Sequence, residues 1–323
     1  MGRGAIYTFL QQAGILHTHR VLIGIVWVVM STGVYGEVPI EEPKLGGNPT
    51  GIAPLYFGPN ALPVPDMSDG RTSSTLRLEV SGDGYWGKEG DKTADLFART
   101  DIPLFTDRVN LNVWMPVYEW YEMTPERQRT CRLQDTAVIR GAGAGDVYIS
   151  TDIQVLRAKR YTPDIAIRAG IKTASGGQFG QARHFDDPGY WFDAAIGKSF
   201  RFGQESSSGD KPWEMRLSVS GGFLCWQTNS ARQNDAVMYG VQLLVSHNLT
   251  SQSALSLRTT YGGYIGWEDH GDRPMTLKTQ LTGHIRGFEP FVRYQWGIRD
   301  YPFHQLRIGL AYNFDILKKR ETK

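Results

Sequence analysis

Hydrophobic and polar residues alternate along most of the chain after residue 72. In residues 164–173, for example, the apolar side chains of Ile167 and Ile171 alternate with the charged side chains of Arg168 and Lys172. Alternation with a period of two residues places successive side chains on opposite faces of a β-strand. The pattern therefore predicts strands with one apolar face and one charged face, in an all-β fold.

We count about twelve such segments. They lie near residues 74–86, 92–102, 108–119, 145–156, 164–173, 189–202, 213–226, 236–247, 253–265, 274–285, 288–298 and 305–314. Tilted strands that cross a membrane need about 9–11 residues in the hydrocarbon. Strands of soluble sandwiches are commonly about five or six residues long. The lengths of these segments therefore favour a membrane barrel.

The connections between the segments alternate in length. The long ones include residues 120–144, 174–188, 227–235 and 266–273, the short ones include 157–163, 248–252 and 286–287, and 203–212 breaks the rule. Long loops at one end and short turns at the other are typical of outer-membrane barrels, whose termini are periplasmic when the strand number is even. The sequence predicts an up-and-down antiparallel transmembrane β-barrel of about 12 strands over residues 72–314, in contact with outer-membrane lipid.

One face of almost every segment carries charged residues. Charged side chains in a dry sandwich core would be costly, whereas a wet lumen tolerates them. The predicted lumen residues are Arg77, Glu79, Asp83, Asp95, Arg99, Asp152, Arg168, Lys172, Asp193, Arg216, Arg258, Lys278, Arg293 and Arg307. Twelve tilted strands give a backbone diameter of about 24 Å, so inward Arg and Lys side chains leave a bore that is narrow or plugged.

The beginning of the chain predicts an export signal over residues 1–36. Arg3 and Arg20 precede the apolar run 21–30, and small residues follow it up to Gly36. These are the parts of a secretory signal, and the run is shorter than the roughly 20 residues that a membrane-spanning helix needs. An uncleaved anchor helix is the alternative.

Residues 37–71 are rich in proline and glycine, which excludes a regular helix or a central strand. Leu55, Phe57 and Leu62 within them nevertheless need a surface to pack on. We expect either an extended segment at the periplasmic mouth or a plug in the lumen, with a disordered linker as the alternative. Residues 315–323 are expected to form a periplasmic tail.

Aromatic residues lie near the predicted strand ends. They are Tyr85, Trp86, Trp120, Tyr121, Tyr190, Trp191, Trp213, Trp226, Tyr264, Trp267 and Tyr301. Amphipathic rings at both ends of an apolar band suit the headgroup layers of a membrane. We therefore expect them to form two aromatic girdles.

The last predicted strand carries a specific motif, Arg307-Ile-Gly309-Leu-Ala-Tyr312-Asn-Phe314. It resembles the β-signal of Gram-negative outer-membrane barrels, in which a polar residue, a glycine and two aromatic residues recur at this spacing. The resemblance implies that Arg307, Gly309, Tyr312 and Phe314 are read by the barrel-assembly machinery. The nine residues that follow depart from the pattern, because such chains often end at the last aromatic residue.

A second resemblance concerns residues 145–176. A strand that begins with Gly145-Asp146 is followed by one that begins with Pro163-Asp164 and ends near Gly176. This arrangement is similar to transporter-like barrels of the phenol-degradation meta-pathway family. The resemblance covers about thirty residues and implies passage of small molecules, without identifying a binding residue.

The sequence offers little support for other functions. A formal charge of +2 without a basic block disfavours nucleic-acid binding, and two cysteines, Cys131 and Cys225, exclude a four-thiolate metal site and leave their pairing open. No His is followed two residues later by Ser, as an outer-membrane phospholipase would require. The loops around His184 and His270 carry acids that could activate water, but such loops are commonly rich in these residues. We predict no enzyme, cofactor or metal.

The sequence predicts a channel that passes small solutes passively through a charged lumen. Nine of the predicted lumen residues are basic and five are acidic, which disfavours cations. A ladder of internal ion pairs in a closed structural or adhesion barrel, acting through its loops, is the main alternative. An outer-membrane hydrolase is a weaker one.

Overall fold

The computed structural model describes residues 53–316, except 134–138, 178–181, 186, 203–212, 228–234, 251 and 267–271. The predicted export signal and all but two residues of the predicted tail lie outside the described residues, and these predictions remain untested. Within the described part of the chain, no helix is long and apolar enough to cross a bilayer.

The described residues form strands with two short helical segments. The strands are β1 (Leu76–Gly87), β2 (Lys92–Pro103), β3 (Val109–Glu122), β4 (Arg140–Gly143), β5 (Tyr148–Leu156), β6 (Asp164–Lys172), β7 (Gly189–Phe202), β8 (Trp213–Cys225), β9 (Asp235–Asn248), β10 (Ser253–Gly266), β11 (Met275–Ile285), β12 (Phe288–Arg299) and β13 (Phe303–Phe314). The helical segments are the 3-10 turn η3 (Lys88–Gly90) and α3 (Pro125–Thr130).

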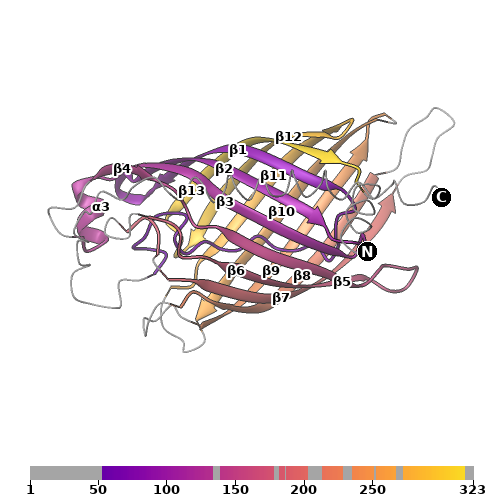
Figure 1. The fold of residues 1–323 in the computed structure, drawn as a ribbon, viewed down its shortest axis with the longest axis horizontal. Helices are drawn as coiled ribbons and strands as arrows, with labels where there is room; N and C mark the ends of the chain where they lie inside the picture. Colours follow the sequence, from indigo (N-terminus) through magenta and orange to yellow (C-terminus); the bar gives the residue numbers. More distant parts are fainter. Residues whose placement is uncertain are drawn as a thin grey trace, which may run out of the picture. The chain divides into compact units, whose positions relative to one another are not determined.

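The strands form one closed antiparallel sheet. Each pairs with its neighbours along the chain, and β1 closes the barrel by pairing with β13 from Leu76–Phe314 to Gly87–Phe303. β4 pairs only with the last four residues of β3, beyond the end of β5, so the wall itself has twelve strands. The prediction of a twelve-stranded up-and-down barrel is confirmed. Figure 1 shows the tilted strands, with β4 and α3 at one end.

Two elements occupy the connection that the sequence analysis treated as a loop, residues 120–144. Helix α3 begins after Thr124, whose hydroxyl accepts a hydrogen bond from the backbone N–H of Arg127, and Pro125 stands at its first position. Strand β4 consists of Arg140 and three small residues. It has no alternation of polar and apolar side chains, so periodicity could not reveal it.

The outer wall of the barrel is apolar. Exposed side chains recur at every second position of the strands, among them Val80, Ile167, Leu217, Val241, Leu257, Val292 and Ile308. Their neighbours in sequence, such as Arg168, Arg216 and Arg307, are buried on the other face. An exposed apolar band of this extent is unsuited to water and suits lipid hydrocarbon.

Strand β3 departs from the predicted alternation at Val117. In the pairing with β2, Leu96 lies opposite Tyr118 and Phe97 opposite Pro116, so Val117 has no partner. This β-bulge reverses the phase of the strand. Glu119 beyond it is buried, whereas Val117 does not continue the apolar face that begins at Val109.

Six of the aromatic residues expected in the headgroup layers lie inside the barrel. Tyr85, Tyr121, Trp191, Trp226, Tyr264 and Tyr301 are buried, whereas Trp86, Trp120 and Trp213 are exposed as expected, Tyr190 is half-buried and Trp267 lies outside the described residues. The inward rings pack near the end that carries α3. We call that end of the lumen the loop-end half, and the end with connections 104–108, 157–163 and 286–287 the turn-end half.

Candidate functional site

The described chain that precedes β1 runs inside the barrel. At the loop end, the backbone N–H of Leu55 donates to Oδ2 of Asp272, which precedes β11, at 2.8 Å. At the turn end, the Thr72 hydroxyl donates to the carbonyl of Asp107, between β2 and β3, at 2.6 Å. We call residues 53–75 the plug. Of the two locations expected for residues 37–71, the described part, 53–71, occupies the lumen.

Side chains of the wall bind the carbonyl groups of the plug. Its prolines prevent regular secondary structure, so these carbonyls need other partners. The hydroxyl of Tyr301 donates to the carbonyl of Pro59 and that of Tyr264 to the carbonyl of Leu62, both at 3.0 Å. Nζ of Lys278 donates to the carbonyl of Val64 at 3.0 Å. The wall therefore supplies the hydrogen bonds that a neighbouring strand would otherwise give.

Asn60 connects the plug to several strands of the wall. Its Nδ2 donates to Oδ2 of Asp95 and to Oε2 of Glu119, both at 2.7 Å, and its Oδ1 accepts from the hydroxyl of Tyr85 at 3.2 Å. The hydroxyl of Tyr148 donates to its backbone carbonyl at 3.2 Å. One amide thus satisfies carboxylates on two different strands.

Apolar packing holds the same part of the plug. Phe57, Ala61 and Leu62 are fully buried in a cluster with Trp191 and Trp226. Figure 1 shows that the plug begins at the end where α3 lies. The space left between the plug and this wall is only about 90 Å³. The loop-end half is therefore closed by packed side chains.

A buried ion network surrounds the loop-end part of the plug. Nη1 of Arg183 lies 3.1 Å from Oδ1 of Asp91, and its Nε lies 3.1 Å from Oε1 of Glu119. Arg127 of α3 lies 3.3 Å from Asp91 and donates through Nη1 to the carbonyl of Leu55 at 2.9 Å. A Cβ at Gly58 would lie 2.8 Å from Cζ of Arg183, so only glycine fits there. The network therefore holds the plug in place and leaves little room for a side chain at Gly58.

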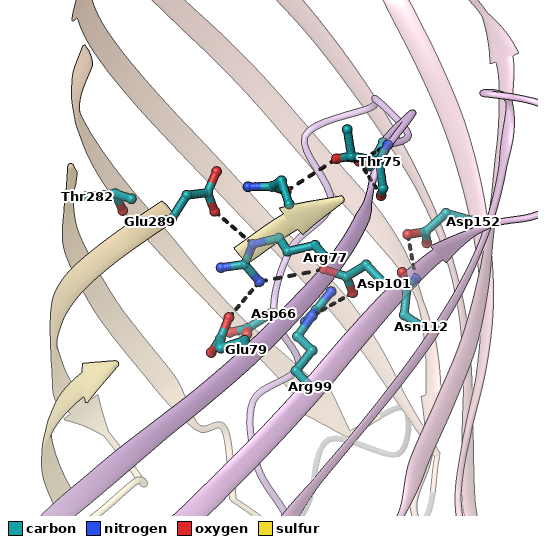
Figure 2. Close-up of polar contacts among 12 residues, drawn as sticks. Asp66, Thr75, Arg77, Glu79, Arg99, Asp101, Asn112, Asp152, Thr282 and Glu289 are labelled. Atoms are coloured by element: carbon teal, nitrogen blue, oxygen red, sulfur yellow. Dashed lines mark hydrogen bonds and ion pairs between the residues drawn. The ribbon is translucent and has the colours of Figure 1, made fainter. Parts of the chain in front are cut away.

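The turn-end half contains a polar chamber of about 550 Å³. A chain of ion pairs crosses one side of it: Arg77 lies 2.6 Å from Glu79 and 2.9 Å from Glu289. Arg99 lies 2.7 Å from Asp101, which also faces Arg77 at 3.7 Å. Figure 2 shows this chain, with Asp66 of the plug beside it. Unlike the loop-end half, the chamber has room for water and solute.

Asp66 fixes the plug at the inner end of the chamber. Its carboxylate lies 2.6 Å from Nζ of Lys278 and 3.4 Å from Nη1 of Arg293, and its carbonyl accepts from Arg168 at 3.0 Å. Burial acts to raise the pKa of Asp66, but the charges of Lys278 and Arg293 outweigh it and hold this pKa well below its ordinary value. The carboxylate therefore stays ionised in mild acid, and the contact persists.

All fourteen predicted lumen residues lie on the inner side of the wall. Those that line the chamber are Arg77, Glu79, Arg99, Asp152, Arg168, Arg258, Lys278, Arg293 and Arg307. Asp193 contacts Arg168, and Arg216 contacts Asp69 of the plug. Asp83, Asp95 and Lys172 are buried toward the loop end.

Several residues of the lumen were missed by the sequence analysis. Asp101 and Glu289 share the phase of Arg99 and Arg293 along their strands, so alternation alone could have identified them. Asp66, Asp91 and Arg183 lie outside strands, where no periodicity exists. Asp66 belongs to the plug, Asp91 to the turn between β1 and β2, and Arg183 to the loop that follows β6.

The structure describes one of the two loop histidines that the sequence places beside acidic residues. His184 is buried, with Nε2 3.5 Å from Glu119 and Nδ1 3.9 Å from Asp146, while His270 lies outside the described residues. Among residues that the structure describes, no group of three or more His, Cys, Asp or Glu could hold a metal ion. Cys131 and Cys225 are both buried and form no disulfide with each other.

No protein-family model matches this chain, and no curated protein does. Solved structures with a similar fold include an outer-membrane channel from Pseudomonas putida F1, with 11% identity, a TM-score of 0.49, and coverage of 77% of this chain and 100% of that one. The transport unit of the autotransporter AIDA-I from Escherichia coli has 10% identity, a TM-score of 0.48, and coverage of 85% and 99%. Similarity at this level does not extend to function, and membership of the phenol-degradation meta-pathway family stays a prediction.

Proposed function

We propose that this chain is an outer-membrane channel for small polar solutes, closed in the described state by its own plug. The apolar outer wall supports a location in lipid. The observation that carries the proposal is that a separate segment, and not the wall, blocks the lumen. A segment that belongs to no strand fills a lumen whose turn-end half is already a charged chamber of about 550 Å³.

Movement of the plug would open the path without breaking the wall. The plug contributes no strand to the sheet, and side chains of the wall rather than a β-ladder hold several of its carbonyls. A barrel that served only as a rigid support would need no separable segment in its lumen. The proposal requires no catalytic residue, cofactor or metal.

Solute uptake into liposomes tests the proposal with the full chain. The double variant Phe57→Ala and Asp66→Asn removes the apolar anchor and the ionic contact of the plug. A buried Phe→Ala change costs about 3–5 kcal/mol and a partly exposed ion pair about 1 kcal/mol, so the open fraction should rise by roughly 10³–10⁴-fold.

The matched control is Phe105→Ala with Glu122→Gln. Phe105 is 84% exposed and Glu122 pairs with the exposed Arg140 at the end of β3, so the same kinds of change are made outside the lumen. Uptake of glucose should increase in the plug variant and stay at the level of the unmodified chain in the control. Equal uptake by all three proteins would refute the proposed function.

A further inference from the structure

Basic residues outnumber acidic residues in the lining of the chamber, and one of the basic residues lacks an ion pair. Eight Lys or Arg residues and six Asp or Glu residues line it. Seven of the basic residues have ion pairs within 4 Å of a described carboxylate, of which Arg71–Asp69 at 2.7 Å and Lys278–Asp66 at 2.6 Å are the shortest on the plug. The side chain of Arg258, on β10, lines the chamber but has neither a hydrogen bond nor an ion pair with the residues that the structure describes.

The plug carboxylate within reach of Arg258 is already bonded to another arginine. Asp69 of the plug lies within electrostatic reach of it, but its carboxylate bonds Arg71 at 2.7 Å. On the wall, Arg258 faces Leu244 of β9 and Gln280 of β11 in the register of the sheet. The guanidinium therefore projects into the chamber with its donors unused by any described carboxylate.

Neutral polar groups form the wall around Arg258. Ser256 and Thr260 flank it on β10, and Gln242, Gln280 and Thr282 line the chamber from the two adjacent strands. The oxygen of Gln242 accepts from Thr260 at 3.2 Å, and Nε2 of Gln280 donates to Thr282 at 3.0 Å. Each amide keeps its other polar atom for a further partner.

This neutral wall borders the ionic side drawn in Figure 2, where Thr282 lies beside Glu289. The charges of Arg71 and Arg77 are within electrostatic reach of Arg258, but each of these arginines has its own carboxylate partner.

We infer that Arg258 and this neutral wall form a binding subsite for a small hydroxylated carboxylate, such as a sugar acid. One guanidinium binds one carboxylate through two parallel hydrogen bonds, and the hydroxyl and amide groups suit neutral hydroxyls. A polyvalent anion would need several free cations, and among the described residues that line the chamber only Arg258 lacks an ion pair. The volume of about 550 Å³ is within the range of ligand pockets.

The inference names a solute class for the proposed channel and rests on that function for its meaning, but binding can be measured without transport. Titration calorimetry on the full chain in detergent uses sodium glucuronate, glucose and sodium phosphate as probes. Glucuronate should bind, and glucose and phosphate should bind at least about tenfold more weakly, because each lacks one of the two kinds of partner.

Arg258→Gln should weaken glucuronate binding by about tenfold or more, and Arg258→Lys should give an intermediate loss because it keeps the charge without the planar fork. Arg140→Gln is the matched control, since this arginine is 73% exposed beside Glu122 and makes the same charge change outside the chamber. Unfolding temperatures of the variants identify any that fail to fold, in which case Gln280→Ala, expected to lose about threefold, replaces them.

Equal binding by the unmodified chain and Arg258→Gln, or no binding of glucuronate at all, would overturn the subsite. Tighter binding of phosphate than of glucuronate would overturn the carboxylate assignment. If glucuronate binds at Arg258 but the protein never passes solute, the subsite is supported and the channel function is refuted. If solute passes but glucuronate does not bind, the channel function is supported and the subsite is refuted.

Discussion

The two halves of the lumen are enclosed by the same strands but are filled in opposite ways. In the loop-end half, the plug packs against Trp191 and Trp226, and the ion network of Arg183 has about 1% exposure. In the turn-end half, Arg77 is 18% exposed and faces a chamber. Packed side chains close the loop-end half, whereas charged side chains surround an open chamber in the turn-end half. The difference suggests that closure depends on a short part of the plug.

The largest effect is expected at the dry ion network. Arg183→Gln would leave the carboxylates of Asp91 and Glu119 buried with fewer partners. Breaking a buried ion pair costs about 3–5 kcal/mol. The free energy of unfolding, measured by urea denaturation in detergent micelles, should fall by that amount. A loss below about 1 kcal/mol would show that water reaches the network, and that the loop-end half is no drier than the turn-end half.

Asn60→Ala should produce the next largest effect. The change removes one amide that donates to both Asp95 and Glu119, and buried groups left without partners cost about 1–3 kcal/mol. The comparison variant is Asn112→Ala, whose amide donates to Asp152 at 2.8 Å beside the chamber, where water can replace it. Hydrogen exchange of residues 53–64 should accelerate in the first variant only. Equal acceleration in both would contradict the assignment of closure to the loop-end half.

Arg77→Gln repeats the arginine change in the chamber. Three carboxylates lose a partner, but solvent in the chamber screens them, so we expect a loss of about 1 kcal/mol. The same urea titration as for Arg183→Gln measures it. A loss as large as that of Arg183→Gln would mean that the chamber is as dry as the loop-end half.

The smallest effect concerns pH at the outer end of the plug. Burial raises the pKa of Asp272 to about 6, and this carboxylate accepts the hydrogen bond from Leu55. Because the unfolded chain releases this proton near pH 4, stability should fall as the pH rises from about 4 to 6 and then level off. We expect an unfolding temperature about 2–4 °C lower at pH 7 than at pH 4.5 from this residue, a difference that Asp272→Asn removes. A pH profile that Asp272→Asn leaves unchanged would assign the dependence to other groups.

The wall of the barrel could be predicted from the sequence because lipid and lumen impose opposite polarity on alternate residues. Arg168 and Ile167 show this in adjacent positions. The alternation stops at Val117, where a bulge changes the phase, and the headgroup prediction was wrong for the six buried rings. Tyr85 shares the phase of Asp83 and Tyr264 that of Arg258, so alternation already placed both inside. We assigned them to the headgroup layers from their position near strand ends alone.

The plug could be predicted only as one of two locations. Its proline residues exclude regular structure but do not say which surface the segment contacts. The partners of Asn60 and Asp66 come from strands far along the chain, such as Glu119 on β3 and Lys278 on β11. Closure of the barrel brings these groups together, and local sequence contains no trace of that.

Single-channel recording in planar bilayers tests most directly whether the plug closes the lumen. The comparison is between the full chain and a variant that lacks residues 53–70, which keeps residues 71–75 as the lead into β1. The account predicts a silent membrane or rare brief openings for the full chain, and steady openings for the shortened one. A shortened barrel that folds but remains silent, or a full chain that conducts equally well, would contradict it.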